Sequence, residues 1–295
     1  MTLKSGTNSN LGAVNHRNLV SRQPDGSFKD LSDTANLSAI CADNLVFRSK
    51  VASGEIPGID DIHKFGSSVV GTTMQPITIG GAYQTPMSAV NLEFVSDDAN
   101  DTSGGTGARS ITIQGLGADW LDLEQVISTN GVAAVQLPSP MTRVHRWFVS
   151  PEGTGTYATQ FAGSHAGNLT LRVSGAGATW SVIPNSPFPF SQSQIGVYSV
   201  PLGKTGFILS KKMGVDATKV ADIYLFQRLK INVIAAPFEP MKVVERDINI
   251  TNPVPVNFTT PLGPFIGPCD VGFMGRVTLS TGTISCEFEL LLLDS

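Results

Sequence analysis

The sequence predicts a mainly β protein whose antiparallel strands pack as a jelly-roll-like sandwich. From Met74 onward, polar and apolar residues alternate with a period of two in many short runs, which is typical of half-buried strands. Turn signals separate these runs, and the chain contains 30 Gly and 18 Pro. Strands do not alternate with long helical patterns, which favours antiparallel sheets over a parallel α/β fold.

The N-terminal part of the chain differs from the rest. Residues 1–65 are mostly polar and predict an extended arm, with one short helix starting after Asp33 or Thr34. The arm either stays disordered or lies on another protein, since it has too little apolar surface for a core. Residues 66–295 predict the β body, which is long enough for one elaborated sandwich or two consecutive ones, joined near residues 185–194.

The individual strands follow from the alternation and from the turns between them. Asn130-Gly131 is a hairpin signal, and Gly104, Gly105 and Gly107 occupy a longer polar connection. One later helix candidate covers residues 216–220. The expected strands are 75–79, 87–95, 109–116, 121–128, 132–137, 144–149, 169–174, 179–183, 195–200, 206–211, 222–229, 231–235, 241–250, 254–259, 271–280 and 283–293.

Composition limits the classes of partner. Charged residues make up only 15% of the chain, against about 25% in typical soluble proteins, which favours a surface covered by other subunits. A formal net charge of −4 gives no basic surface for nucleic acid, and no apolar run is long enough to cross a membrane. Cys41, Cys269 and Cys286 form no metal-binding pattern and predict free, buried thiols.

An acidic loop holds the metal candidates. Asp97, Asp98 and Asp101 offer oxygen ligands for Ca²⁺, but the glycine and glutamate of a calcium-binding helical loop are missing. A solvated acidic turn is the favoured interpretation.

No motif indicates catalysis. The histidines lack metal-binding spacing, no nucleophile elbow occurs, and Gly203-Lys204-Thr205 lacks the preceding glycine of a phosphate loop. We therefore expect no cofactor and no enzymatic activity. Trp120, Trp147 and Trp180 fall on different strands, where they serve either as core anchors, the favoured interpretation, or as a platform for sugars.

Two loops combine proline with aromatic residues, at 184–190 and 261–268. Proline cannot donate to a sheet ladder, so neither loop is expected to be a central strand. The loops either cover a core or face a neighbouring subunit, because aromatic residues are enriched at the centres of interfaces. The interface candidates are Phe188, Phe190, Phe265 and Ile266.

Several short motifs run through the body: His63-Lys64-Phe65-Gly66, Ile79-Gly80-Gly81-Ala82-Tyr83, Asp101-Thr102, Gly105-Thr106-Gly107-Ala108-Arg109, Ile113-Gln114-Gly115-Leu116, Val200-Pro201-Leu202-Gly203-Lys204-Thr205, Asp270-Val271 and Ile284-Ser285-Cys286-Glu287-Phe288. This series resembles one in virion structural proteins of tailed bacteriophages. The resemblance covers roughly residues 63–293. The chain departs from it at Ile77-Thr78-Ile79, where many relatives carry an aromatic-acidic pair, and after Gly66, where they carry Arg-Asn.

The resemblance implies a non-enzymatic particle component, a head decoration or fibre protein or a neck or tail-associated one, with no active site. We expect a homo-oligomer, with a trimer favoured, that attaches through its arm to capsid, portal or neck proteins. Its location would be the virion, assembled in the bacterial host cytoplasm. The alternative is a carbohydrate-binding receptor module of the tail or fibre. That module would hold a host surface glycan through the three tryptophans and the acidic loop.

Overall fold

The computed structural model describes residues 20–22, 28–30, 45–80, 82–150, 165–185, 191–234 and 241–295. The chain divides into two compact units, Met1–Asp60 and Asp61–Ser295. In the first unit, β1 (Val20–Arg22) pairs antiparallel with β2 (Phe28–Asp30), and α2 (Leu45–Ala52) follows. The helix expected after Asp33 or Thr34 lies outside the described residues, and so does Cys41.

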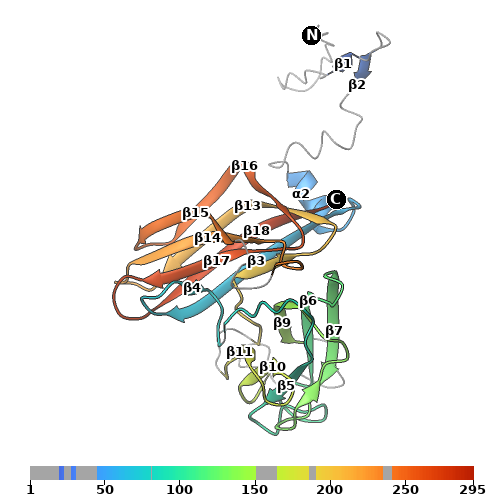
Figure 1. Cartoon of the computed structure of the whole chain (residues 1–295), viewed down its shortest axis with the longest axis vertical. Coiled ribbons are helices and arrows are strands. Elements are labelled where there is room, and N and C mark those ends of the chain that lie inside the picture. Colours follow the sequence, from blue (N-terminus) through green and yellow to red (C-terminus); the bar gives the residue numbers. More distant parts are fainter. Residues whose placement is uncertain are drawn as a thin grey trace, which may run out of the picture. The chain divides into compact units, whose positions relative to one another are not determined.

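The second unit consists of two β-sandwiches, which Figure 1 shows in different colours. The first sandwich packs the sheet β12-β17-β14-β15, to which β4 adds by pairing with β17, against the sheet β16-β13-β18-β3. Its strands are β3 (Ile59–Val70), β4 (Gln75–Pro76), β12 (Val197–Val200), β13 (Lys204–Val215), β14 (Ala221–Leu229), β15 (Met241–Ile250), β16 (Val254–Ile266), β17 (Cys269–Val277) and β18 (Gly282–Asp294).

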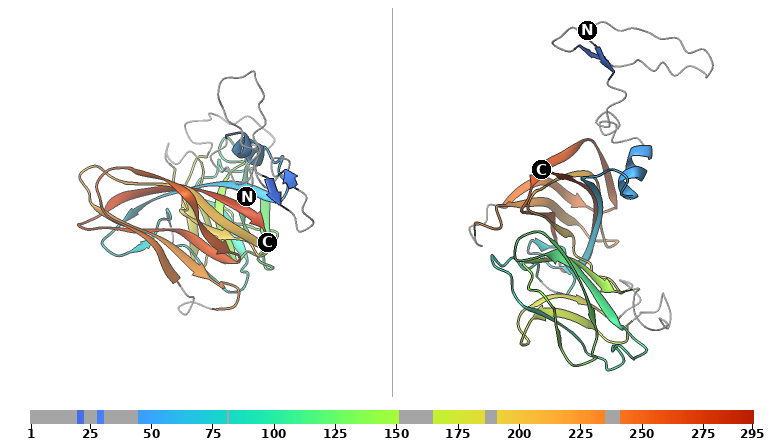
Figure 2. Two further views of the ribbon diagram at one scale, coloured as in Figure 1. Left: turned by 90° about the horizontal axis from the view of Figure 1, so that it is seen from above. Right: turned by 90° about the vertical axis from the view of Figure 1, so that its right-hand side faces the viewer.

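The second sandwich is inserted into the first, between β4 and β12, and we call it the inserted sandwich. It packs the sheet β11-β10-β5-β8 against the sheet β7-β6-β9, in green and yellow-green in Figures 1 and 2. Its strands are β5 (Leu92–Ser96), β6 (Ser110–Leu116), β7 (Asp122–Ser128), β8 (Val135–Gln136), β9 (Arg143–Val149), β10 (Leu169–Val173) and β11 (Thr179–Ile183).

The mainly β, antiparallel fold expected from the sequence is confirmed. The structure adds that the two sandwiches are nested: the chain leaves the first after β4 and returns to it at β12. Of the joint expected at residues 185–194, residues 191–194 precede β12, and residues 186–190 lie outside the described residues. Among the described residues, no helix is long and apolar enough to span a bilayer.

Alternating side chains build both cores. In β18, the residues from Ile284 to Leu292 at every second position are buried in the first sandwich, where Phe288 meets Phe273 edge to face with ring centroids 5.7 Å apart. In the inserted sandwich, Trp147 and Phe94 meet in the same way at 6.4 Å. Burial of each such ring contributes about 1.5–3 kcal/mol to the free energy of unfolding, and the edge-to-face contact adds to this.

Several local expectations differ from the structure. β3 covers residues 59–70 and was not expected as a strand, because its polar residues Lys64, Ser67 and Ser68 interrupt the alternation although all three are buried. Residues 231–234 form a turn rather than a strand, and residues 216–220 form no helix. The proline-aromatic loop at 261–268 is largely part of β16, an edge strand, where proline is tolerated.

A β-bulge in β9 at His145 sets the directions of the side chains on either side of it. Gln114 pairs with Arg146 but Gly115 pairs with Val144, so His145 is the extra residue. The backbones are so close here that a Cβ on Gly115 would lie 2.0 Å from the carbonyl oxygen of Arg143. Only glycine fits this position without moving β9.

We predict that Gly115→Ala lowers the free energy of unfolding by about 1–3 kcal/mol, because the added methyl group must push β9 away from β6. Urea unfolding followed by tryptophan fluorescence measures this loss. Gly104→Ala is the matched control, since a Cβ at Gly104 meets no atom within 4 Å. Equal stability of the Gly115→Ala and Gly104→Ala variants would contradict the close approach of β6 and β9 at Gly115.

Candidate functional site

Asp101 is the centre of the acidic loop and is fully buried. Its Oδ1 accepts hydrogen bonds from the backbone amides of Ala108 and Ala166, each at 2.7 Å. Its Oδ2 accepts from Ser96 Oγ at 2.6 Å and from the amide of Gly167 at 2.8 Å. The preference for a solvated turn was wrong at this position, because four donors occupy the carboxylate in place of water.

The other two loop carboxylates also bind their own chain. Asp97 accepts from the backbone amide and side-chain amide of Asn168, at 2.6 and 2.7 Å, and Asp98 accepts from the amide of Asn100 at 2.8 Å. Among the described residues, no group of three or more His, Cys, Asp or Glu is arranged to hold a metal ion. The loop therefore fastens residues 97–108 to residues 166–168.

The second polar centre lies at the seam, by which we mean the contact of β9 with strands β3, β12 and β17 of the first sandwich. Arg143 on β9 and Asp270 on β17 are both fully buried, with Arg143 Nε 3.0 Å from Asp270 Oδ1. Ser199 Oγ donates to the same oxygen at 2.7 Å and lies 2.6 Å from Tyr83 Oη. Arg143 Nη1 donates to the carbonyl of Pro86 at 2.8 Å.

Burial and charge also set the protonation state of Tyr83 in this network. Burial and, next, the Asp270 charge raise the pKa of Tyr83 well above its usual range, so the phenol stays protonated. The guanidinium of Arg143 lies 5.2 Å from the ring centroid of Trp120, close enough for a cation–π contact.

The three tryptophans belong to the cores. Trp120, Trp147 and Trp180 are 8%, 0% and 5% exposed. The interpretation as core anchors holds, and a sugar platform built from these rings is excluded by their burial.

A third group, also at the seam, contains basic residues. Lys64 on β3 donates from Nζ to the carbonyl of His145, the extra residue of the β9 bulge. Burial and the nearby Arg146 charge lower the pKa of Lys64 to about 7. Burial, followed by the charges of Lys64 and Arg146, lowers the pKa of His145 to about 3, and its ring packs on Tyr198 at 4.5 Å between centroids.

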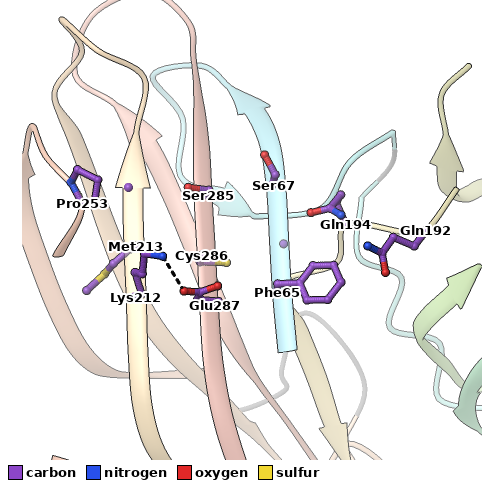
Figure 3. Close-up of a pocket in the computed structure, with 12 residues that line it drawn as sticks. Phe65, Ser67, Gln192, Gln194, Lys212, Met213, Pro253, Ser285, Cys286 and Glu287 are labelled. Carbon is purple, nitrogen blue, oxygen red and sulfur yellow. Dashed lines mark ion pairs between the residues drawn. The ribbon is translucent and has the colours of Figure 1, made fainter. Parts of the chain in front are cut away.

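A groove of about 380 Å³ runs beside the seam (Figure 3). In this groove, Lys212 on β13 and Glu287 on the paired strand β18 form an ion pair, with Lys212 Nζ 3.0 Å from Glu287 Oε1. Burial raises the pKa of the Cys286 thiol to about 12, so this residue is a poor nucleophile at neutral pH. Phe65, Gln192 and Gln194 line the other side. The described lining of the groove contains no activated nucleophile.

The interface candidates differ in position. Phe265 is 1% exposed and packs in the first sandwich, so for this ring the core-covering interpretation applies and the interface interpretation was wrong. Ile266 is 62% exposed. Phe188 and Phe190 lie outside the described residues.

Sequence reasoning did not identify the seam residues. Lys64, Tyr83 and Asp270 stand in the motifs described above, but nothing in the motifs shows that they meet Arg143 or His145. The available signal was the placement of charged residues within otherwise apolar strands, such as Arg143 at the start of β9 and Asp270 inside β17.

No family model and no curated protein matches the chain. Among solved structures, the Gt strain of infectious bursal disease virus shares 10% identity, covering 83% of this chain and 77% of that chain, with a TM-score of 0.20. The VP2 subviral particle of the same virus shares 9% identity over 84% and 81%, with a TM-score of 0.18. These are weak likenesses to proteins of viral particles, and at such TM-scores they carry no argument.

We predict that Asp101→Asn lowers the free energy of unfolding by about 2–3 kcal/mol, because an amide nitrogen would face two of the four donors. Thermal unfolding, with and without added Ca²⁺, measures both stability and metal binding. Asp98→Asn is the control, since that side chain is half-buried and accepts one bond. A large Ca²⁺-dependent rise in melting temperature would refute the role described for the loop.

We predict that Arg143→Met costs about 3–5 kcal/mol of unfolding free energy, because it leaves the Asp270 charge buried without its partner. The double variant Arg143→Met/Asp270→Leu should lose less than the sum of the two single variants, which a double-mutant cycle in urea measures. Lys212→Met breaks an exposed ion pair and should cost under about 1 kcal/mol. If the losses of unfolding free energy in the Arg143→Met and Asp270→Leu variants were strictly additive, this would count against an interaction between the two residues.

Proposed function

We propose that this protein is a non-enzymatic structural subunit of a tailed bacteriophage particle. One observation carries the proposal: residues of the motif series that resembles phage virion proteins occupy structural positions that hold the body together. Lys64, Tyr83 and Asp270 join the two sandwiches, Asp101 fastens the acidic loop, and Gly115 permits the β9 bulge. These positions support a resemblance that lies in how the body is built, which is the kind of resemblance that we expect between structural subunits.

Self-association has a candidate surface on the first sandwich. Strands β15 and β16 follow each other in the chain and are edge strands of opposite sheets, and we call them the rim. Met241, Val243, Ile248 and Ile266 on the rim are 45–62% exposed. Apolar side chains exposed on edge strands favour burial against another subunit.

On the β16 side of the rim, contact through side chains is favoured over the addition of a strand. β16 carries Pro255, Pro261 and Pro264, which lack the amide hydrogen that a partner strand would need. Closed symmetric packing, with a trimer favoured, suits a particle component. Residues 61–65 of the expected arm belong to the second unit, within β3, so residues 1–60 are the segment that would attach the oligomer to capsid, portal or neck proteins in the virion.

We predict that the purified full chain forms a stable oligomer in size-exclusion chromatography with light scattering. Ile248→Glu/Ile266→Glu should convert it to a folded monomer, because two charges per subunit would be buried in the contact. Val132→Glu, at a 62% exposed site of the inserted sandwich, should leave the oligomer intact. A monomer at all concentrations tested would refute self-association.

The arm is tested separately. Deleting residues 1–60 removes the first unit, and the remaining body should fold and oligomerise but fail to enter particles in a complementation assay with labelled subunit. Normal incorporation of the truncated chain would refute attachment through the arm.

A further inference from the structure

Two lysines of the first sandwich are buried, and their surroundings differ. Lys211 Nζ lies 2.7 Å from Glu245 Oε2 and 2.6 Å from Asp247 Oδ2, so two carboxylates compensate its charge. Lys64 makes one hydrogen bond, to the His145 carbonyl, and forms no ion pair with a carboxylate among the described residues. A buried ammonium group without a counter-ion is costly, whereas a neutral amine can still donate to that carbonyl.

The groups that face Lys64 do not supply a negative charge at neutral pH. From β9 come His145 and Arg146, and from β18 comes Cys286, whose thiol stays protonated because burial raises its pKa to about 12. Tyr198 on β12 covers the His145 ring, and His145 Nδ1 is buried without a hydrogen-bond partner. Burial thus disfavours the charged forms of two basic groups at the point where β3 and β9 meet.

We propose that the seam is an acid-sensitive hinge: it opens as Lys64 and His145 take up protons, which releases the inserted sandwich from the first. Opening exposes both groups to water, where the charged forms are stable. The Arg143–Asp270 pair opposes opening, so the seam stays closed when the two bases are neutral.

The pH range in which each group affects opening follows from the linkage between proton binding and opening of the seam. The pKa of Lys64 is about 7 in the closed seam, below its usual value of 10.5, so the opening constant rises up to about tenfold per pH unit as pH falls from 10.5 to 7. Below pH 7 both states hold this proton and its effect stays constant. The pKa of His145 is about 3 against 6.5, so its contribution appears as pH falls from 6.5 towards 3.

Native-state hydrogen exchange of the full chain tests the hinge. Peptides covering β9 and β12 are followed from pH 8.5 to 5, with each rate divided by the intrinsic rate at that pH. The corrected opening constant of the wild-type seam should rise about tenfold between pH 8.5 and 7, and about tenfold again between pH 6.5 and 5. A peptide covering residues 221–225 of β14, in the core of the first sandwich, reports on global unfolding and should change less.

Three variants separate the contributions. Lys64→Gln keeps a hydrogen-bond donor and cannot be charged, so it should abolish the first rise, and His145→Asn should abolish the second. Lys211→Met should speed exchange at β13 and β15 without changing the pH profile of the seam. A pH-independent wild-type profile, or identical profiles for wild type and Lys64→Gln, would overturn the proposal. If Lys64→Gln folds poorly, the wild-type profile alone decides.

This test is independent of the proposed function, because it needs neither particles nor oligomers. A failed incorporation assay would leave the hinge intact, and a pH-independent seam would leave the structural role intact.

Discussion

The ion pair between Arg143 and Asp270 is the interaction on which the arrangement of the second unit depends. Both side chains are fully buried, and they join strands that lie 127 positions apart in sequence. A buried pair gains little net stability over apolar residues of equal volume, because both charges lose their hydration. It is, however, strongly unfavourable to break, so it fixes one relative position of the two sandwiches.

The geometry of β9 makes that pair available. The bulge at His145 gives β9 one residue more than its partner β6, which places Arg143 against β17 and the carbonyl of His145 against Lys64. Gly115 permits this because no side chain stands between the two backbones. A single local irregularity thereby determines two long-range contacts, and bulges of this kind commonly redirect side chains at sites where a ladder meets another structure.

The acidic loop and the seam use buried polar groups in contrasting ways. Asp101 accepts four hydrogen bonds, two from residues near it in the chain and two from the amides of Ala166 and Gly167, which compensate its charge. Lys64 donates to one carbonyl, and no carboxylate of the described residues pairs with it. The first arrangement satisfies a buried charge with hydrogen-bond donors, whereas the second is the basis of the proposed dependence of the seam on proton concentration.

The sequence alone determined the fold class and most strands, because side-chain alternation is a local property of a half-buried strand; the expected 179–183 and 241–250 match β11 and β15. The tertiary structure decided that β3 is a strand, that one sandwich interrupts the other, and that Lys64, Asp101, Arg143 and Asp270 are buried. Alternation cannot predict these, since a polar residue can be buried only when a distant segment supplies its partner, as β17 does for Arg143.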